Sequence, residues 1–191
     1  MNPAGRAAQV ELNTARLLLR SIRESDEALY CDLFCDADTM RHIGPPWTRA
    51  EAARAFRGVL EATRCTPPRA LFMTLIPKDT RQPIGLCTLQ NFDAARRQTE
   101  LGVMLLPSRR EQMFATDALI AVIGHAFAAL GVDEVWVRFA VDHVACERLA
   151  LSVGLVRHAG ISPLDLGTNL WRWSAYRASW RPAAGGAVRR T

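Results

Sequence analysis

The sequence predicts an α+β domain built around one mostly antiparallel, partly mixed β-sheet that is flanked by helices. Strand-like and helix-like segments follow one another in the order β-α-α-β-β-β-α-β-α-β-β, which is not the regular alternation of a doubly wound fold. The 191 residues suffice for one domain with its own core. Apolar residues make up 49% and charged residues 23%, as in an ordinary globular protein.

A strand and a helix open the predicted domain. Residues 14 to 22 form a short apolar run bounded by arginines and predict the first strand. Ser25 or Asp26 can cap the helix that follows, in which apolar residues recur at helical spacing over residues 29 to 34. The acidic stretch that begins at Asp36 ends that pattern.

A second helix follows a rigid loop. The loop is Gly44-Pro45-Pro46-Trp47, and its prolines have no backbone N–H to donate. Thr48 is the expected N-cap of a helix over residues 49 to 63, and Glu51 completes a capping box.

Three strands in a meander come next, followed by a long helix. The strands are expected at residues 70 to 76, 84 to 91 and 99 to 106. Residues 115 to 130 are apolar at helical spacing, and Gly131 stands where a C-terminal cap is expected.

The last third of the domain returns to strands. Residues 134 to 141 predict a strand, and residues 144 to 153 predict a short helix closed by Gly154. A final pair of strands is expected at residues 155 to 159 and 168 to 176.

The two ends lie outside the predicted fold. We expect a flexible N-terminus over residues 1 to 9, a folded domain over residues 10 to 181, and a disordered tail over residues 182 to 191. No run is long and apolar enough for a membrane span, and residues 1 to 9 lack the apolar core of a signal peptide. A cytoplasmic location without membrane contact is therefore the expectation.

The cysteines and charges narrow the class further. Five scattered cysteines do not form a disulfide framework, and Cys31 and Cys35 lack further ligands for a metal site. The net charge is +5, and Lys78 is the one lysine among many arginines, a bias typical of a GC-rich bacterial genome. Because the arginines are dispersed, nucleic-acid binding is not expected.

One stretch, residues 100 to 119, couples a strand, a short polar loop and a long helix. The helix begins near Gln112 to Thr116 and offers unpaired backbone N–H groups and a positive dipole end to an anion. Arg109 and Arg110 add positive charge beside it. This segment is a candidate phosphate site.

Several motifs of the chain, in this order, resemble the GNAT (Gcn5-related N-acetyltransferase) superfamily. They are Thr14-Ala15-Arg16-Leu17-Leu18-Leu19-Arg20 with Asp26, Met40 to Pro46, Ile84-Gly85, Glu100-Leu101-Gly102, residues 110 to 119 and residues 145 to 155. The nearest resemblance is to the subfamily that contains the ribosomal-protein N-terminal acetyltransferases. It covers residues 10 to 178, and several such enzymes form homodimers, so a homodimer is possible here.

The resemblance implies a GNAT fold in which the sheet is splayed between its fourth and fifth strands, residues 99 to 106 and 134 to 141. Acetyl-CoA, or another acyl-CoA, would enter that gap. Its pantetheine would pair with the fourth strand, and its pyrophosphate would lie at the loop that follows. The cofactor-binding residues implied are Leu105, Arg109, Arg110, Gln112, Met113, Phe114, Ala115, Thr116 and His143.

The cofactor loop departs from the family pattern. Met113 stands where the family has a glycine that lets the backbone approach phosphate, and Glu111 places a negative charge near an anion site. A Met113→Gly substitution is expected to tighten CoA binding.

Three residues are candidates for the chemistry. Glu100, at the start of the fourth strand, is the candidate general base for the acceptor amine, or else an exposed strand-end carboxylate. His143 and Cys146 stand where relatives commonly carry asparagine and serine. His143 can act as a base, contact pantetheine or cap a helix; Cys146 can supply a proton or simply pack.

The acceptor site is expected near Trp47, Asn91 and Phe92. Trp47 can stack on a substrate or cover the core. The remaining tryptophans are expected in core or dimer packing: Trp136, Trp171, Trp173 and Trp180.

The sequence therefore predicts an N-acetyltransferase that moves an acetyl or other acyl group from an acyl-CoA to a primary amine. The amine would belong to a small molecule or a protein N-terminus. Two alternatives stay open, both motivated by the departures at Met113, Glu111, His143 and Cys146. One is a catalytically weakened binding module of the same fold, and the other is an acyltransferase whose donor is a carrier-protein thioester.

Overall fold

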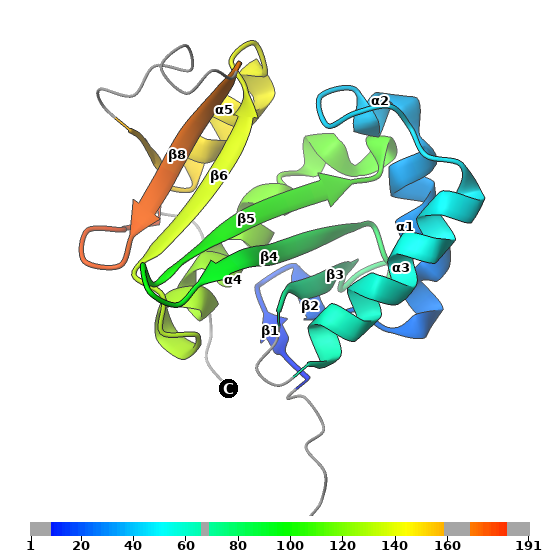
Figure 1. Ribbon diagram of the computed structural model, residues 1–191, viewed down its shortest axis with the longest axis horizontal. Helices are drawn as coiled ribbons and strands as arrows, with labels where there is room; N and C mark the ends of the chain where they lie inside the picture. Colours follow the sequence, from blue (N-terminus) through cyan, green and yellow to red (C-terminus); the bar gives the residue numbers. More distant parts are fainter. Residues whose placement is uncertain (1–8, 66–68, 159–168, 183–191) are drawn as a thin grey trace, which may run out of the picture.

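A single mixed sheet of eight strands organises the chain (Figure 1). The computed structural model describes residues 9–65, 69–158 and 169–182. The strand order is β1-β2-β3-β4-β5-β6-β8-β7, and every neighbouring pair is antiparallel except β5 and β6, which are parallel. The strands are β1 Glu11–Asn13, β2 Leu17–Ser21, β3 Leu71–Pro77, β4 Gly85–Asp93, β5 Gln98–Leu105, β6 Glu134–Ala140, β7 Val156–Arg157 and β8 Leu170–Tyr176.

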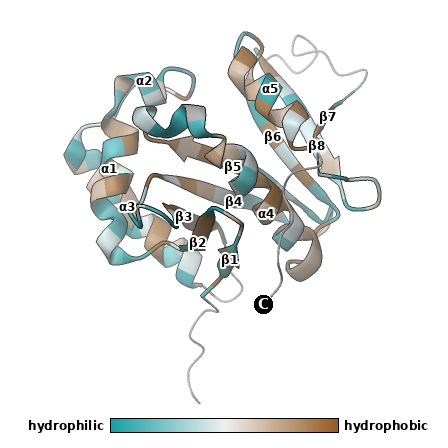
Figure 2. Cartoon of the chain, turned by 180° about the vertical axis from the view of Figure 1, so that it is seen from behind, coloured by the Kyte–Doolittle hydropathy of each residue, from teal (hydrophilic) through white to brown (hydrophobic). Residues whose placement is uncertain are grey.

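Helices cover the two faces of the sheet unequally. The helical segments are η1 Glu24–Asp26, α1 Glu27–Cys35, α2 Ala37–Met40, α3 Arg49–Arg64, η2 Pro107–Gln112, α4 Phe114–Ala129 and α5 Val144–Ser152. One apolar cluster joins α4 and α5 to one face of the sheet, the face seen in Figure 2. A second cluster joins α1 and α3 to the other face, over the β2 to β5 half. On that second face, β6 and β8 carry no helix (Figure 1).

The predicted α+β fold and the order of its elements are confirmed. The predicted strands and helices all appear, with ends that differ by a few residues. The short edge strand β1, which pairs with β2, was not predicted, because three residues carry too little periodic pattern to mark a strand. Residues 159 and 168, at the ends of two predicted strands, lie outside the described residues.

The predicted role of Asp26 as a helix cap is only partly right. Asp26 occupies the N-cap position of α1, but its side chain makes no cap hydrogen bond there. The carboxylate is 2% exposed and accepts hydrogen bonds from Arg20 at 2.7 and 2.8 Å and from the Thr74 hydroxyl at 2.8 Å. Burial opposes the charge of Asp26, but these donors outweigh it and lower the carboxyl pKa. Asp26 therefore ties β2, α1 and β3 together.

The capping box at α3 is as predicted. The Thr48 hydroxyl accepts from the backbone N–H of Glu51, and the Glu51 carboxylate accepts from the backbone N–H of Thr48 at 2.8 Å. Both partners lie within four residues, so this contact is fixed by local sequence.

The predicted splay lies between β5 and β6. The two strands pair only from Gln98 to Glu100 on β5 and from Glu134 to Trp136 on β6. Beyond these residues β5 continues to Leu105 and β6 to Ala140 without pairing to each other, and Figure 1 shows them diverging. Glu100 and Trp136 are thus the last paired residues before the sheet opens.

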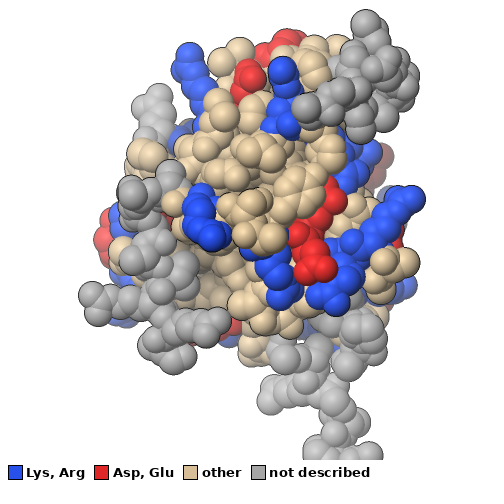
Figure 3. All heavy atoms as spheres, turned by 90° about the vertical axis from the view of Figure 1, so that its left-hand side faces the viewer, with Lys and Arg blue, Asp and Glu red and all other residues tan. Residues whose placement is uncertain are grey.

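The described residues show few other features with a direct bearing on function. No helix among them is long and apolar enough to cross a membrane, and they contain no group of three or more residues suited to hold a metal ion. All five cysteines are free thiols. Basic side chains are spread over the side of the molecule shown in Figure 3, and acidic groups lie beside some of them.

Candidate active site

The candidate base Glu100 lies at the point where β5 and β6 part. Glu100 is 8% exposed, so its carboxylate is not the freely solvated strand-end group that the sequence left open. The Asn91 side-chain amide donates to it at 2.5 Å, and the Arg138 guanidinium donates to both of its oxygens at 3.3 Å. Glu100 therefore has one short hydrogen bond, from Asn91, and one longer ion pair, with Arg138.

A β-bulge brings Asn91 to Glu100. Gln90 pairs with Glu100 and Asp93 with Gln98, so that two residues of β4, Asn91 and Phe92, stand opposite one residue of β5. Asn91 has a φ of 52°, a left-handed conformation that asparagine tolerates better than most residues. The bulge aims the Asn91 amide at Glu100, while Phe92 packs against the apolar cluster on the other face of the sheet. Of these two predicted acceptor-site residues, Asn91 contacts the candidate base.

Arg138 was missed in the sequence. It is the only side chain of β6 that the described contacts join to Glu100, and the two residues are 38 positions apart in sequence. A signal existed, because Arg138 interrupts the otherwise apolar run Val135-Trp136-Val137 to Phe139. The strand period places it on the face of Trp136, which pairs with Glu100.

The edge of β5 that faces the splay has free backbone groups. The Leu106 N–H bonds the Ile84 carbonyl, and antiparallel ladders alternate, so Leu101, Val103 and Leu105 direct their N–H and C=O groups away from β4. The pairing of Glu100 with Trp136 still uses the Leu101 N–H, so among the described residues the edge without a strand partner comprises Val103 and Leu105. It can accept an extended ligand with amide groups of its own.

The amino terminus of α4 adjoins this edge. Met113 precedes the helix in a left-handed conformation, with φ 57° and ψ 16°, and its side chain is 61% exposed. The first bond of the helix runs from Asp117 to the Met113 carbonyl at 3.3 Å, so the N–H groups of Phe114, Ala115 and Thr116 precede it. Met113 makes no side-chain cap, which leaves these donors for an anion.

The arginines of the predicted phosphate loop are not equally available. Arg110 donates to the Asp38 carboxylate at 2.5 Å and to the Thr39 hydroxyl at 2.7 Å, and more weakly to the Leu105 carbonyl at 3.4 Å. The positive charge of Arg110 is therefore partly neutralised by Asp38 on α2. Arg109 is half-buried on the same short helix, and its side chain has no hydrogen-bond or ion-pair partner among the described residues.

Arg16, which the sequence reasoning did not assign to this site, fixes the loop from the other side. Its guanidinium donates to the Gln112 carbonyl at 2.9 Å and to Asp117 at 2.8 Å, and it lies over the Phe114 ring at 5.0 Å. At the far side of the first turn, the Thr116 hydroxyl lies 3.5 Å from that of Ser152 on α5. The turn that presents the free N–H groups is thus held by contacts from the β1–β2 turn and from α5.

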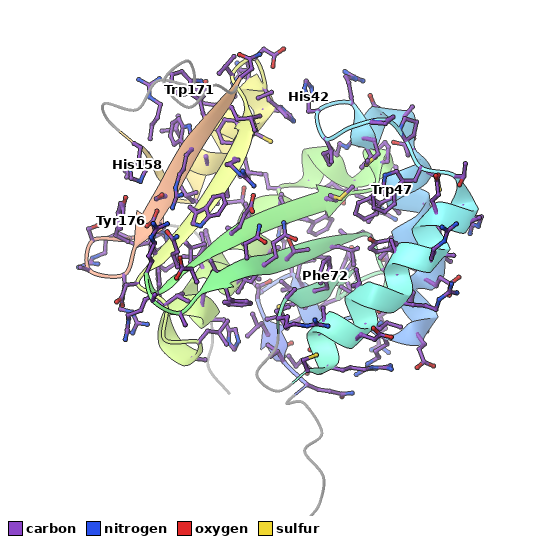
Figure 4. The ribbon with its side chains drawn as sticks, viewed as in Figure 1. His42, Trp47, Phe72, His158, Trp171 and Tyr176 are labelled. Carbon is purple, nitrogen blue, oxygen red and sulfur yellow. The ribbon has the colours of Figure 1, made fainter. Side chains whose placement is uncertain are left out.

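His143 and Cys146 follow the end of β6, at the open end of the splay and away from its paired end at Glu100. His143 is the N-cap of α5 and its Nδ1 accepts from the Cys146 N–H at 3.4 Å, so the predicted cap role is present. Its ring faces that of His42, which is labelled in Figure 4, with centroids 4.0 Å apart. Burial, and secondly His42, lower the pKa of His143, so the ring is neutral at pH 7.

Burial raises the pKa of the Cys146 thiol to about 11. The group therefore stays protonated at neutral pH, which suits a proton donor and disfavours a nucleophilic thiolate. Cys146 also packs against the core under α5, as the packing interpretation expects.

Trp47 stacks on Phe34, with ring centroids 4.7 Å apart, and packs against the apolar cluster of α1 and α3. Its backbone N–H donates to the Phe34 carbonyl at 2.9 Å. The core-covering role that the sequence allowed is therefore present, and Figure 4 shows Trp47 between the helices of that half of the molecule.

Comparisons with known proteins agree with this fold. A sequence model of the acetyltransferase (GNAT) domain matches residues 16–156. The N-acetyltransferase YoaA of Bacillus subtilis, itself uncharacterized, is 24% identical over 145 residues, which are 75% of this chain and 81% of that protein.

Two solved structures show the same fold. Spermidine N-acetyltransferase from Vibrio cholerae, in complex with CoA and spermine, superposes with a TM-score of 0.71 at 16% identity, over 85% of this chain and 96% of that one. Ribosomal-protein-S5-alanine acetyltransferase from Vibrio fischeri superposes with a TM-score of 0.73 at 14% identity, over 91% and 100% of the two chains.

The parted strands and the uncapped helix terminus beside them define an acyl-CoA-dependent acyltransferase. The chain belongs to the GNAT acetyltransferase family, whose domain model spans most of it. Its cofactor is an acyl-CoA, and the residues present fit that group. The free edge of β5 suits pantetheine amides, and the N–H groups of Phe114, Ala115 and Thr116 suit a pyrophosphate.

Proposed function

We propose that this chain transfers an acetyl group from acetyl-CoA to the primary amine of a small molecule or of a protein N-terminus. The observation that carries the proposal is the position of Glu100. Its buried carboxylate lies where the β5–β6 ladder ends, on the sheet face away from α4, and it is oriented by Asn91. An amine on that face and a thioester in the splay would meet beside one carboxylate.

In the proposed reaction Glu100 accepts the proton of the acceptor ammonium, directly or through a water molecule, so that the nitrogen lone pair becomes free. The nitrogen then bonds to the acetyl carbonyl carbon, the C–S bond breaks, and the sulfur leaves with the electron pair. His143, as a neutral imidazole, would accept the second proton of the nitrogen, and Cys146, whose burial keeps it protonated, would donate a proton to that sulfur. Backbone N–H groups along β5 would polarise the carbonyl.

The donor phosphates would bind at the start of α4. Phe114, Ala115 and Thr116 contribute N–H groups and the helix dipole, and Arg109 contributes charge. Arg110 would join them by leaving Asp38 and Thr39. We further propose a cytoplasmic site of action, in keeping with five free thiols, and a possible homodimer.

Two measurements test this proposal. Acetyl-CoA and CoA are titrated in a thermal-shift assay, since a ligand that binds only the folded state raises the melting temperature. Release of CoA is then followed with polyamines, amino acids, simple amines and peptides as acceptors. A shift with turnover of at least one amine supports the proposal, and no shift at millimolar cofactor would refute acetyl-CoA as the donor.

The donor itself is tested by replacing acetyl-CoA with acetyl-pantetheine, which lacks the nucleotide phosphates. We expect a loss of about 100-fold or more in kcat/KM, because the phosphate contacts at α4 are absent. Equal kcat/KM with both donors would favour the carrier-protein thioester instead.

A further inference from the structure

The sheet face beside Glu100 carries two arginines around one tryptophan. Trp136 pairs with Glu100 across the strands, and its side chain is nearly buried at 8% exposure. The guanidinium carbons of Arg138 and Arg172 lie 5.0 and 4.4 Å from the centre of its ring. Arg138 on β6 and Arg172 on β8 are directly opposed in register. Like charges in that arrangement repel each other unless anions lie nearby.

Hydrogen-bond donors in this group lack acceptors. Within the described part of the chain, the Trp136 Nε1 and Arg172 Nε groups are buried and have no hydrogen-bond partner. Buried donors are almost always paired in folded proteins, so two orphaned donors on neighbouring strands indicate a missing acceptor. The Trp136–Arg138–Arg172 cluster accordingly has two donors without acceptors, even though Glu100 and Glu134 pair with its two guanidinium groups.

The charges around Glu100 point to the same conclusion. Arg172 is held by Gln98 and Glu134, each at 2.9 Å. Arg138 is half-exposed, and its ion-pair partner among the described residues is the Glu100 carboxylate at 3.3 Å. To take a proton from an amine, Glu100 must share or release Arg138. A purely cationic acceptor would then face an uncompensated guanidinium, whereas an acceptor with its own anionic group would pair with it.

We propose that the acceptor amine carries an anionic group, a carboxylate or a phosphate, and that Arg138 and the Trp136 indole N–H bind that group. The ammonium of such an acceptor meets Glu100 while its anion replaces Glu100 as the partner of Arg138. Each of these four charged groups then has a partner of opposite charge. This inference rests on the proposed function and narrows its acceptor class.

The test uses pairs of amines that differ only in an anionic group. The carboxylate pairs are tyrosine with tyramine, histidine with histamine, and lysine with cadaverine. A phosphate pair is O-phosphoethanolamine with ethanolamine, and a peptide pair has aspartate or asparagine as the second residue. Turnover is measured by CoA release, and binding of the N-acetylated form of each compound to the CoA-loaded protein is measured by calorimetry.

In the wild-type protein we expect the anionic member to have a kcat/KM at least about tenfold higher, or to bind about tenfold more tightly. The pair that shows the largest ratio tells carboxylate from phosphate acceptors. Arg138→Leu should abolish the ratio, because KM rises more for the anionic member than for its partner, and Arg138→Lys should restore part of it. The matched control is Arg157→Leu, since Arg157 also stacks on a tryptophan, Trp171 at 4.6 Å, but pairs in register with Trp173 on the α5 side of the sheet.

Three results would overturn the assignment. They are a preference for the uncharged or cationic member, a ratio that survives in Arg138→Leu, and a protein that binds acetyl-CoA but neither turns over nor binds any anionic member. Failure of the proposed function is distinguishable, because it appears as the absence of a thermal shift with acetyl-CoA before any acceptor is added.

Discussion

The imidazole rings of His42 and His143 lie 4.0 Å apart, centroid to centroid, and join the loop after α2 to the first turn of α5. Through Asp38 and Thr39, the same α2 segment also holds Arg110 of the cofactor loop. The segment thus contacts both the loop predicted to bind pyrophosphate and the open end of the splay. A positive charge on both rings would weaken the His42–His143 contact, because like charges repel.

A pH dependence of stability follows from His143. Its pKa in the folded state is lowered by burial first, then by His42 and by the more distant Arg110, while Asp142 opposes the shift. The unfolded chain therefore binds a proton more readily. The stabilisation is complete above the unfolded pKa of about 6.5 and is lost as pH falls through the lowered folded value. We expect the melting temperature to fall between pH 7 and pH 5.

The control for this experiment is His143→Asn, because asparagine is a good N-cap and keeps the start of α5 intact. The variant should keep its stability at pH 7 and lose part of the pH slope. Burial also lowers the pKa of His125, so a residual slope of the same sign is expected. An unchanged slope in His143→Asn would show that the His42–His143 contact does not sense pH.

Met113 is expected to be a point of backbone strain. It holds φ at 57°, a region that costs a non-glycine residue roughly 1–2 kcal/mol, while its side chain is largely exposed and adds little packing. Met113→Gly should therefore raise the free energy of unfolding by about 1 kcal/mol, somewhat less if glycine loosens the unfolded chain. It should also tighten CoA binding, since the backbone can approach phosphate more closely. Denaturant titration and calorimetry measure the two effects.

Met113→Ala separates the two causes, because alanine removes the side chain but keeps the Cβ. If strain is the cause, the alanine variant gains neither stability nor affinity. A gain in both variants would instead assign the effect to the bulk of the methionine side chain.

We expect Asp38 to compete with the cofactor for Arg110. Its carboxylate and the Arg110 guanidinium are 2.5 Å apart, and both are partly exposed. Asp38→Asn should release Arg110 and remove a negative charge from the loop, tightening CoA binding about three- to tenfold at low salt, equivalent to roughly 1 kcal/mol. The gain should shrink as salt rises. Asp32→Asn, which breaks the exposed pair with Arg49, is the matched control. Equal affinity in Asp38→Asn and wild type would show that Arg110 does not reach the phosphates.

Local patterns in the sequence were sufficient to predict most elements. The capping box of Thr48 and Glu51 lies within one turn, and the apolar spacing of α4 repeats over 16 residues, so each was readable from neighbouring residues. Asp26 also looked like a cap. Its buried pairing with Arg20 and Thr74 depends on β3, which is 48 residues away at Thr74, and no local pattern reveals it.

In the candidate site, too, some residues could be found from local sequence motifs, whereas their contacts depend on distant parts of the chain. Glu100 was found by its place in a recognisable motif, but its partners come from two other strands. Asn91 reaches it through a bulge, and Arg138 reaches it across the parallel pair. The left-handed conformation of Met113 was foreshadowed by the glycine expected there, whereas the hold of Asp38 on Arg110 joins positions 72 residues apart. Contacts of this kind follow from the tertiary fold and not from periodicity.

The central claim is that Glu100 takes the proton of the acceptor amine. Its most direct test is the kcat/KM of Glu100→Gln at saturating acetyl-CoA, with the best acceptor of the amine pairs above and with the acetyl-CoA thermal shift measured on the same sample. The control is Glu24→Gln, which removes a carboxylate paired with Arg64 on the surface. We predict that Glu100→Gln loses a factor of about 10² to 10⁴ while its thermal shift with acetyl-CoA is unchanged. Turnover at the wild-type rate would contradict the assignment of Glu100 as the base.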